Sequence, residues 1–384
     1  MSVPAGQAAP QQGLAGLSPA NFGMVMATGI VSIAAQLLGQ PGAAQALLAL
    51  NAVLYAVLWL LTLLRLARHR RRVLDDLADH LRGPGFFTTV AGTAVLGSQC
   101  VLVAGQRGVA LALWVVAAAL WLVLIYGILG IFTLKARKPA LDQGINGAWL
   151  LAVVATQSIA VLGALLSTRF GPQARLAMNF LALALWLWGG MLYIWMMSLI
   201  FYRYTFFTLA PGDLTPPYWI NMGAMAISTL AGALLVQHAP QAPLLQSLLP
   251  FIKGFTLFYW ATGSWWIPML LVLGVWRYGV RRHPLRYDPM YWAAVFPLGM
   301  YAVCTLEMAQ ALELGFLQGV PPVFGIAAGL AWVSAFGGLL GRLAGLVRRR
   351  GAISKAADHP PCSPWPTLAV GEAFGDPDEA GEPG

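Results

Sequence analysis

Apolar runs of membrane-spanning length recur along almost the whole chain. Each is long enough to cross the ~30 Å hydrocarbon core of a bilayer as an α-helix. The runs lie near 19–39, 43–67, 86–104, 109–134, 146–167, 177–202, 218–238, 248–276, 290–313 and 322–347. Because only helices and closed barrels satisfy their backbone hydrogen bonds in lipid, this pattern predicts an all-α integral membrane protein with ten transmembrane helices.

Composition argues against the other large classes of protein. Only 10% of the 384 residues are charged and 59% are hydrophobic, whereas a soluble domain carries about 25% charged residues. A transmembrane β-barrel would show segments of about ten residues with alternating polarity, and the runs here do not alternate. The net charge of +9 would suggest nucleic acid for a soluble protein. Here the basic residues lie in short loops between apolar runs, so we expect no nucleic-acid partner.

Basic residues in the loops predict the topology. With ten helices, nineteen of the 23 Lys and Arg residues fall on one face of the membrane. These are Arg65, Arg68, Arg70, Arg71, Arg72, Arg82, Lys135, Arg137, Lys138, Arg203, Arg277, Arg281, Arg282, Arg286, Arg342, Arg348, Arg349, Arg350 and Lys355. The opposite face has only Arg107, Arg169 and Arg175. The positive-inside rule then predicts a multi-pass cell-membrane protein with both termini in the cytoplasm.

The chain divides into three predicted parts. Residues 1–17 form a polar, uncharged leader on the cytoplasmic side, and residues 18–348 form the ten-helix membrane domain. Residues 349–384 are rich in Pro, Gly and acidic residues, which predicts a disordered cytoplasmic tail. The first apolar run lacks a basic flank and a cleavage site, so we interpret it as a retained helix.

Residue types that carry enzyme or redox chemistry are scattered. Cys100, Cys304 and Cys362 form neither a metal motif nor a disulfide framework. A haem in the membrane needs histidine pairs within the spans, but the histidines lie in loops or the tail, apart from His238 at the end of a run. The sequence contains no HExxH or GxSxG motif. We therefore expect no metal, no cofactor and no enzymatic activity, with a membrane redox protein as a remote alternative.

The apolar runs alternate in character. The odd-numbered runs carry Asn, Gln, Ser, Thr and Gly, whereas the second, fourth and sixth are mostly Leu, Val, Ala and Trp. Polar side chains are costly against lipid and usually face a protein interior or a watery path. This predicts odd helices inside, even helices outside and a central path. The candidate pore-lining residues are Gly23, Thr28, Thr93, Gly97, Thr156, Gln157, Ser228, Gly299 and Val303. The alternative is that these residues only mediate close helix packing.

Few ionisable side chains fall inside the runs. Glu307 lies eleven residues after Phe296, about three helical turns, so both share a face. A lone acid in such a path is a candidate for proton coupling, and Lys253 is a candidate for an electrostatic role unless it extends to the interface. Pro297 is predicted to kink its helix. The bulky Phe296 beside it can close a path by blocking or dewetting it, with core packing as the alternative.

Three segments resemble a known family. They are "FGMVMATGIVSI" (22–33), "FYWATGSWWIPMLLVLGVWR" (258–277) and above all "YWAAVFPLGMYAVCT" (291–305). They are similar to the tellurite-resistance/dicarboxylate transporter family, which includes plant guard-cell slow anion channels, fungal malate permeases and fungal sulphite exporters. The likeness spans roughly residues 18–347. It implies five helical hairpins around a central pore, a homotrimer with one pore per subunit, and a pore-occluding role for Phe296.

The resemblance also sets the expected function. It implies transport of small anions through a phenylalanine-gated pore, with the anion and the lipid bilayer as partners. The expected cargo is a C4-dicarboxylate such as malate or succinate, or an inorganic anion including tellurite or sulphite. A passive chloride or nitrate channel is the alternative, and a scaffold without transport is a remote one.

Overall fold

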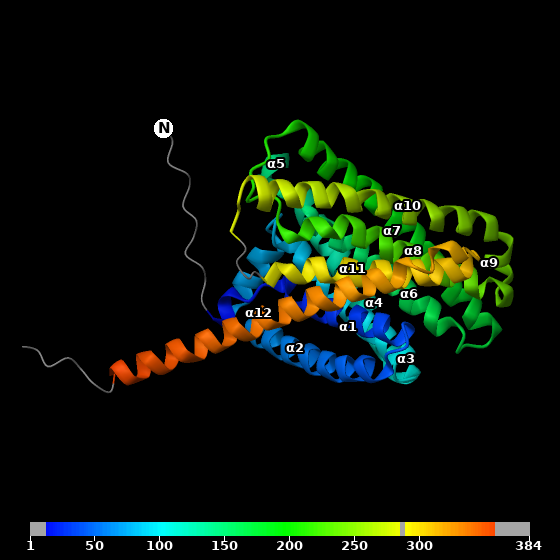
Figure 1. Cartoon of the computed structure of the whole chain (residues 1–384), viewed down its shortest axis with the longest axis horizontal. Coiled ribbons are helices and arrows are strands. Elements are labelled where there is room, and N and C mark those ends of the chain that lie inside the picture. The colour runs from blue at the N-terminus through cyan, green and yellow to red at the C-terminus, as the bar shows by residue number, and fades with distance from the viewer. Residues whose placement is uncertain (1–12, 285–288, 358–384) are drawn as a thin grey trace, which may run out of the picture. The chain divides into compact units, whose positions relative to one another are not determined.

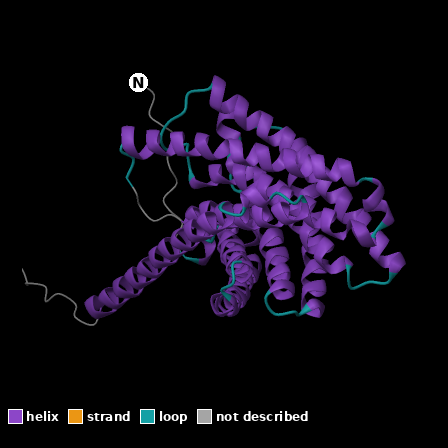
Figure 2. Cartoon of the chain, turned by 45° about the vertical axis from the view of Figure 1, so that its right-hand side comes forward, coloured by secondary structure: helices purple, strands orange, loops and turns teal. Residues whose placement is uncertain are grey.

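The structure is a computed structural model that describes residues 13–284 and 289–357. Within these ranges the chain is built of helices joined by loops, and no strand is present (Figure 2). Ten described helices are long and apolar enough to cross a membrane. The predicted class, an all-α chain with ten membrane spans, is therefore confirmed. Residues 1–12, Arg286 and residues 358–384, about which the sequence made predictions, lie outside the described residues.

The ten long helices follow the predicted order (Figure 1). They are α1 (Gly23–Leu37), α2 (Pro41–Leu77), α3 (Phe87–Leu102), α4 (Arg107–Leu134), α6 (Leu151–Ser167), α7 (Pro172–Phe206), α8 (Ile220–His238), α10 (Leu249–Gly274), α11 (Trp292–Ala311) and α12 (Val320–Ala357). A π-helical turn, Val275–Val280, continues α10. Two short helices, α5 (Leu141–Gly144) and α9 (Pro243–Ser247), were not predicted, because a single turn is too short to show a helical period.

Five helices form a closed inner ring. Each of α1, α3, α6, α8 and α11 contacts the next in that order, and α11 contacts α1 again. Within their spans, 72% to 94% of the residues are buried. Glycines allow two of these contacts to be close. A Cβ atom at Gly97 would lie 2.5 Å from Leu162 Cδ2, and one at Gly299 would lie 2.9 Å from Ile30 Cγ2.

The other five long helices cover this ring. Helices α2, α4, α7 and α10 contact α1, α3, α6 and α8 respectively, and the ring of Phe324 on α12 lies 4.5 Å from that of Tyr301 on α11. Only 11% to 56% of their spans is buried. Large apolar side chains such as Val123, Phe180 and Leu330 are exposed on them. An apolar surface of this kind requires lipid around it.

Two helices extend beyond the predicted apolar runs. Helix α2 continues to Leu77, past a break in helical geometry at His69, so several loop arginines lie on a helix. Helix α12 ends at Ala357, whereas the predicted apolar run ends near residue 347. The chain forms two compact units, Met1–Leu339 and Leu340–Gly384. The site lies within the first unit.

Candidate functional site

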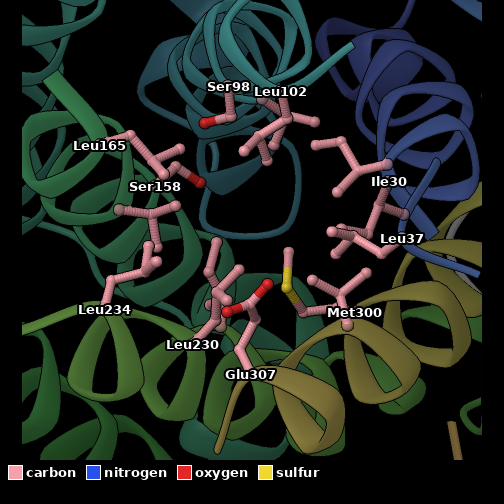
Figure 3. A pocket seen from close by; sticks show the side chains of 15 residues that line it. Ile30, Leu37, Ser98, Leu102, Ser158, Leu165, Leu230, Leu234, Met300 and Glu307 are labelled. Atoms are coloured by element: carbon pink, nitrogen blue, oxygen red, sulfur yellow. The ribbon is translucent and has the colours of Figure 1, made fainter. Parts of the chain in front are cut away.

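A cavity runs between the five inner helices, and all five contribute equally to its wall. Figure 3 shows ten labelled side chains of this wall pointing from the surrounding helices into one space. Three residues come from each helix: Ile30, Ile33 and Leu37; Val95, Ser98 and Leu102; Ser158, Val161 and Leu165; Ile227, Leu230 and Leu234; and Met300, Val303 and Glu307. We call this space the axial cavity. Its symmetry about the ring places it where a central path would lie.

The wall of the axial cavity is almost entirely apolar. Its two hydroxyl groups donate hydrogen bonds to backbone carbonyls of their own helices, Ser98 to Ala94 over 3.1 Å and Ser158 to Val154 over 2.7 Å. Among the fifteen lining residues, Glu307 carries the one charged side chain. Gln237 Nε2 on α8 donates to Glu307 Oε2 over 2.7 Å. The cavity is therefore an apolar space with a single, hydrogen-bonded carboxyl group in its wall.

A second cavity opens where the inner helices begin. It is lined by Ser18, Ala20, Gly23, Met26, Leu81, Arg82, Gly85, Thr88, Ala148, Leu151, Pro217, Ile220, Met290, Trp292, Ala293 and Phe296. We call it the vestibule. A 3₁₀ turn precedes every inner helix: Pro19–Phe22, Gly83–Phe86, Gly147–Leu150, Pro216–Trp219 and Pro289–Tyr291. The amino-terminal ends of all five helices thus meet around the vestibule, and each end carries partial positive charge from the helix dipole.

Phe296 lies at the boundary of the two cavities. Its side chain lines the vestibule, and Met300, Val303 and Glu307 on the following turns of α11 line the axial cavity. The Phe296 side chain is only 2% exposed. Pro297 beside it packs against α8 at Gly223, where an added Cβ would lie 2.8 Å from Pro297 Cγ. The neighbouring helix therefore holds the backbone that carries Phe296 in place.

Most predicted polar lining residues face the outer helices. A hydrogen bond joins each of Thr28, Thr93 and Thr156 to an outer-helix aromatic: to Trp332 over 3.0 Å, to Tyr55 over 3.0 Å and to Trp121 over 2.8 Å. Trp260 on α10 donates to Thr305 on α11 over 3.0 Å in the same way. On α8, Trp186 of α7 donates to the carbonyl of Ser228 over 2.8 Å. Every inner helix is thus joined to an outer helix by an aromatic hydrogen bond.

The other candidates divide between cavity and packing. Val303 lines the axial cavity and Gly23 lines the vestibule. Gln157 Nε2 donates to the Trp186 carbonyl over 2.9 Å, and Gly97 and Gly299 make the inner-ring contacts described above. Lys253 is exposed on α10 and is not among the residues that line either cavity. Gln157, Gly97 and Gly299 thus make contacts between helices, as Thr28, Thr93 and Thr156 do.

The hydrogen bonds between the rings predict a measurable loss of stability. We expect Trp121→Phe to lower the free energy of unfolding by about 0.5–1.5 kcal/mol, the usual range for one polar contact between membrane helices. Thermal unfolding in detergent measures this effect. Trp188→Phe is the matched control, because Trp188 is 37% exposed on the apolar surface. Adding Thr156→Val to Trp121→Phe should cost less than the sum of the two changes; full additivity contradicts the assignment.

Arg82 was counted in the sequence only as a topology signal. The structure places it in the vestibule wall, next to the turn Gly83–Phe86 that leads into α3. Its position directly before an inner helix was the available signal, because residues there face the mouth of the ring. Arg72, by contrast, is exposed on α2 and does not directly precede an inner helix.

Known proteins resemble this chain over most of its length. Residues 16–340 match the family described as voltage-dependent anion channel. An uncharacterized membrane protein of Mycobacterium tuberculosis is 39% identical over 165 residues, which cover 43% of this chain and 83% of the relative. Two uncharacterized transporters of Methanocaldococcus jannaschii are each 24% identical. One match covers 83% of this chain and 89% of the relative, and the other covers 66% and 72%.

The family match spans the whole ring that surrounds the two cavities. It begins before α1 and ends inside α12, so it includes Phe296, Glu307 and every other residue that lines them. The chain belongs to the voltage-dependent anion channel family, whose members move anions across membranes.

Proposed function

We propose that the chain carries small, singly charged anions along the axis of the inner ring, and that Phe296 closes this path. The observation that supports it is the succession of vestibule, Phe296 side chain and axial cavity within a ring of five helices. Side chains from all five helices surround the path, as a pore within one chain requires. On this proposal the protein is a transporter or channel and not an enzyme.

The charge around the vestibule favours anions. Five helix amino-termini meet there, and each is equivalent to about half a positive charge at its end. Arg82 adds a full positive charge. Backbone and side chain therefore attract an anion to the mouth of the path and repel a cation.

The wall of the axial cavity favours a single negative charge. The cost of moving an ion out of water grows with the square of its charge, and an apolar wall returns little of it. A doubly charged dicarboxylate needs cationic groups within the passage, and none is among the fifteen lining residues. Chloride, nitrate and the singly protonated forms of sulphite, tellurite, malate or succinate fit this wall better than dianions.

Glu307 supports a second mode, in which a proton moves with the anion. An ionised carboxylate in the wall of the axial cavity opposes a passing anion, whereas the protonated acid does not. Its contact with Gln237 suits either form, since an amide is both donor and acceptor. A proton-coupled carrier and a passive channel therefore share the same path and differ in the part that Glu307 plays.

The setting of the path follows from the charges and the family. We propose that the vestibule faces the cytoplasm of a cell, because the basic loops lie at the face where the inner helices begin. Both chain termini would then be cytoplasmic. A homotrimer with one pore in each subunit stays our expectation from the family resemblance, and native mass spectrometry in detergent tests it.

A flux screen in liposomes tests the proposal. Purified protein is reconstituted into liposomes. The liposomes are loaded with chloride, nitrate, sulphite, malate or succinate at several pH values, with and without a pH gradient. We expect flux of singly charged anions, and flux of malate and succinate that rises as pH falls toward their singly charged forms. Absence of flux for every anion overturns the proposal, and flux of the dianions alone overturns the charge selection.

A further inference from the structure

Among the described residues, Arg82 is the charged side chain in the vestibule wall, at the start of the proposed path. Among the sixteen residues that line the vestibule, it alone carries a charge. Its side chain is 40% exposed, so the guanidinium is in contact with solvent while belonging to the cavity wall. An anion that enters the vestibule toward Phe296 therefore meets this group.

The fold fixes both the backbone and the side chain of Arg82. Asp79 Oδ1 accepts hydrogen bonds from the backbone N–H groups of Leu81 and Arg82, each over 2.8 Å. Asp76 Oδ1 lies 2.9 Å from Arg82 Nε. A long arginine side chain normally loses much rotamer freedom when it binds a ligand. Here that freedom is already restricted, so less entropy is lost on binding an anion.

Asp76 is itself held by a second arginine. Arg65 Nη2 pairs with the other carboxylate oxygen of Asp76, and Arg65 also donates to the carbonyl of Ala15 over 3.2 Å. The side chain of Arg65 is only 4% exposed. Two guanidinium groups thus share the Asp76 carboxylate, while the Asp79 carboxylate binds backbone N–H groups. The exposed member of the cluster is the one that faces the vestibule.

The ion pair with Asp76 is closest at Nε of Arg82 and not at the two terminal nitrogens of the guanidinium. Among the described residues, the two terminal nitrogens of Arg82 donate no hydrogen bond, while the backbone N–H donates to Asp79. Planar guanidinium donors match two oxygens of a carboxylate or another oxyanion and bind them with paired hydrogen bonds. A halide has no second oxygen to accept such a pair.

We propose that Arg82 is the capture residue of the vestibule and that it selects oxyanions over halides before they reach Phe296. The proposal rests on the proposed function, because it requires that anions use this path. Asp76 acts as a positioning residue that orients the Arg82 side chain toward the vestibule. The axial cavity then admits the captured ion by charge, whereas Arg82 distinguishes ions by shape.

Initial rates of flux into liposomes, measured against concentration for nitrate and chloride, test this role. We expect Arg82→Gln to raise the half-saturating nitrate concentration about threefold to tenfold, as loss of one focusing charge implies. The maximal rate should change little, because the passage beyond Phe296 is intact. Arg82→Lys should leave chloride flux near the wild-type value and nitrate flux below it. A lysine keeps the positive charge but lacks the planar pair of guanidinium donors.

The controls separate capture from folding and from surface charge. Arg72→Gln removes the same charge from an exposed site on α2. It should leave the half-saturating concentrations of nitrate and chloride unchanged. Unfolding temperatures of all variants show whether they are folded. A lower maximal rate with an unchanged half-saturating concentration, or an equal effect of Arg72→Gln, overturns the capture role. Wild-type protein without any anion flux instead contradicts the proposed function itself.

Discussion

Replacing Phe296 by alanine should raise the passive anion flux by about tenfold to a hundredfold. This corresponds to a decrease of about 1.4–2.8 kcal/mol in the free-energy barrier to permeation. The Phe296 ring is buried and lines the vestibule, one helical turn before Met300, which lines the axial cavity. A bulky apolar ring closes such a junction both by filling it and by excluding water. Alanine leaves a gap that joins the two cavities. Flux in liposomes at fixed anion concentration measures the change.

The control for this prediction is Phe22, a second buried phenylalanine, in the turn that leads into α1. Phe22 is 1% exposed, and its ring packs edge-on against Trp59 of α2 with centroids 5.3 Å apart. Both alanine variants lose stability, about 3–5 kcal/mol for a fully buried phenylalanine. Only Phe296→Ala should raise flux. Unchanged flux in a folded Phe296→Ala variant, or an equal rise with Phe22→Ala, removes Phe296 as the gate.

The sequence predicted the number of spans and the two classes of helix because lipid imposes strict rules. A span must be apolar and about 20 residues long, and polar side chains must turn away from lipid. The alternation of polar and apolar runs therefore matched the alternation of buried and exposed spans. The family resemblance of the segment around Phe296 also predicted a pore-occluding role for this residue. These signals are local in the sequence, so they could be read without coordinates.

The direction of each polar side chain could not be read in this way. A threonine that avoids lipid has two places to go, the central cavity or the seam between the rings. Thr28, Thr93 and Thr156 lie at the seam, where each meets an aromatic partner far away in the sequence. The cavity wall instead contains residues such as Ile30 and Leu230, which look like ordinary core residues in a sequence. Only the assembled ring distinguishes them.

The proposed role of Arg82 could not be predicted from the sequence for a related reason. Every loop arginine contributes equally to the count that predicts topology. What distinguishes Arg82 is its contact with Asp76 and its place beside the start of α3. The contact with Asp76 depends on the end of α2. Asp76 lies in the part of α2 that was expected to be a loop.

Glu307→Gln is expected to make the anion flux independent of pH. An ionised carboxylate about 6 Å from a passing anion opposes it by about 3 kcal/mol at an effective dielectric constant of about 20, a factor of about one hundred. Wild-type flux of an anion that does not itself titrate, such as nitrate, should therefore rise as pH falls and Glu307 becomes protonated. Glutamine mimics the protonated acid, so the variant should keep the high rate at every pH.

The helices that pack against α11 carry other titratable groups, so the prediction needs a control variant. Helix α8 carries His238 next to Gln237, α10 carries Tyr259 and Lys253, and α1 carries none. The control is Glu313→Gln, which removes an exposed carboxylate just beyond the same helix and should leave the pH profile unchanged.

The same variant separates the two transport modes. In a passive channel, Glu307→Gln only raises the rate, because the carboxyl group is an obstacle to the anion. In a proton-coupled carrier, an imposed pH gradient drives accumulation of the anion, and Glu307→Gln should abolish that accumulation while downhill flux continues. A profile that keeps its pH dependence in Glu307→Gln but loses it in Glu313→Gln contradicts both modes. The titrating group would then lie outside the axial cavity.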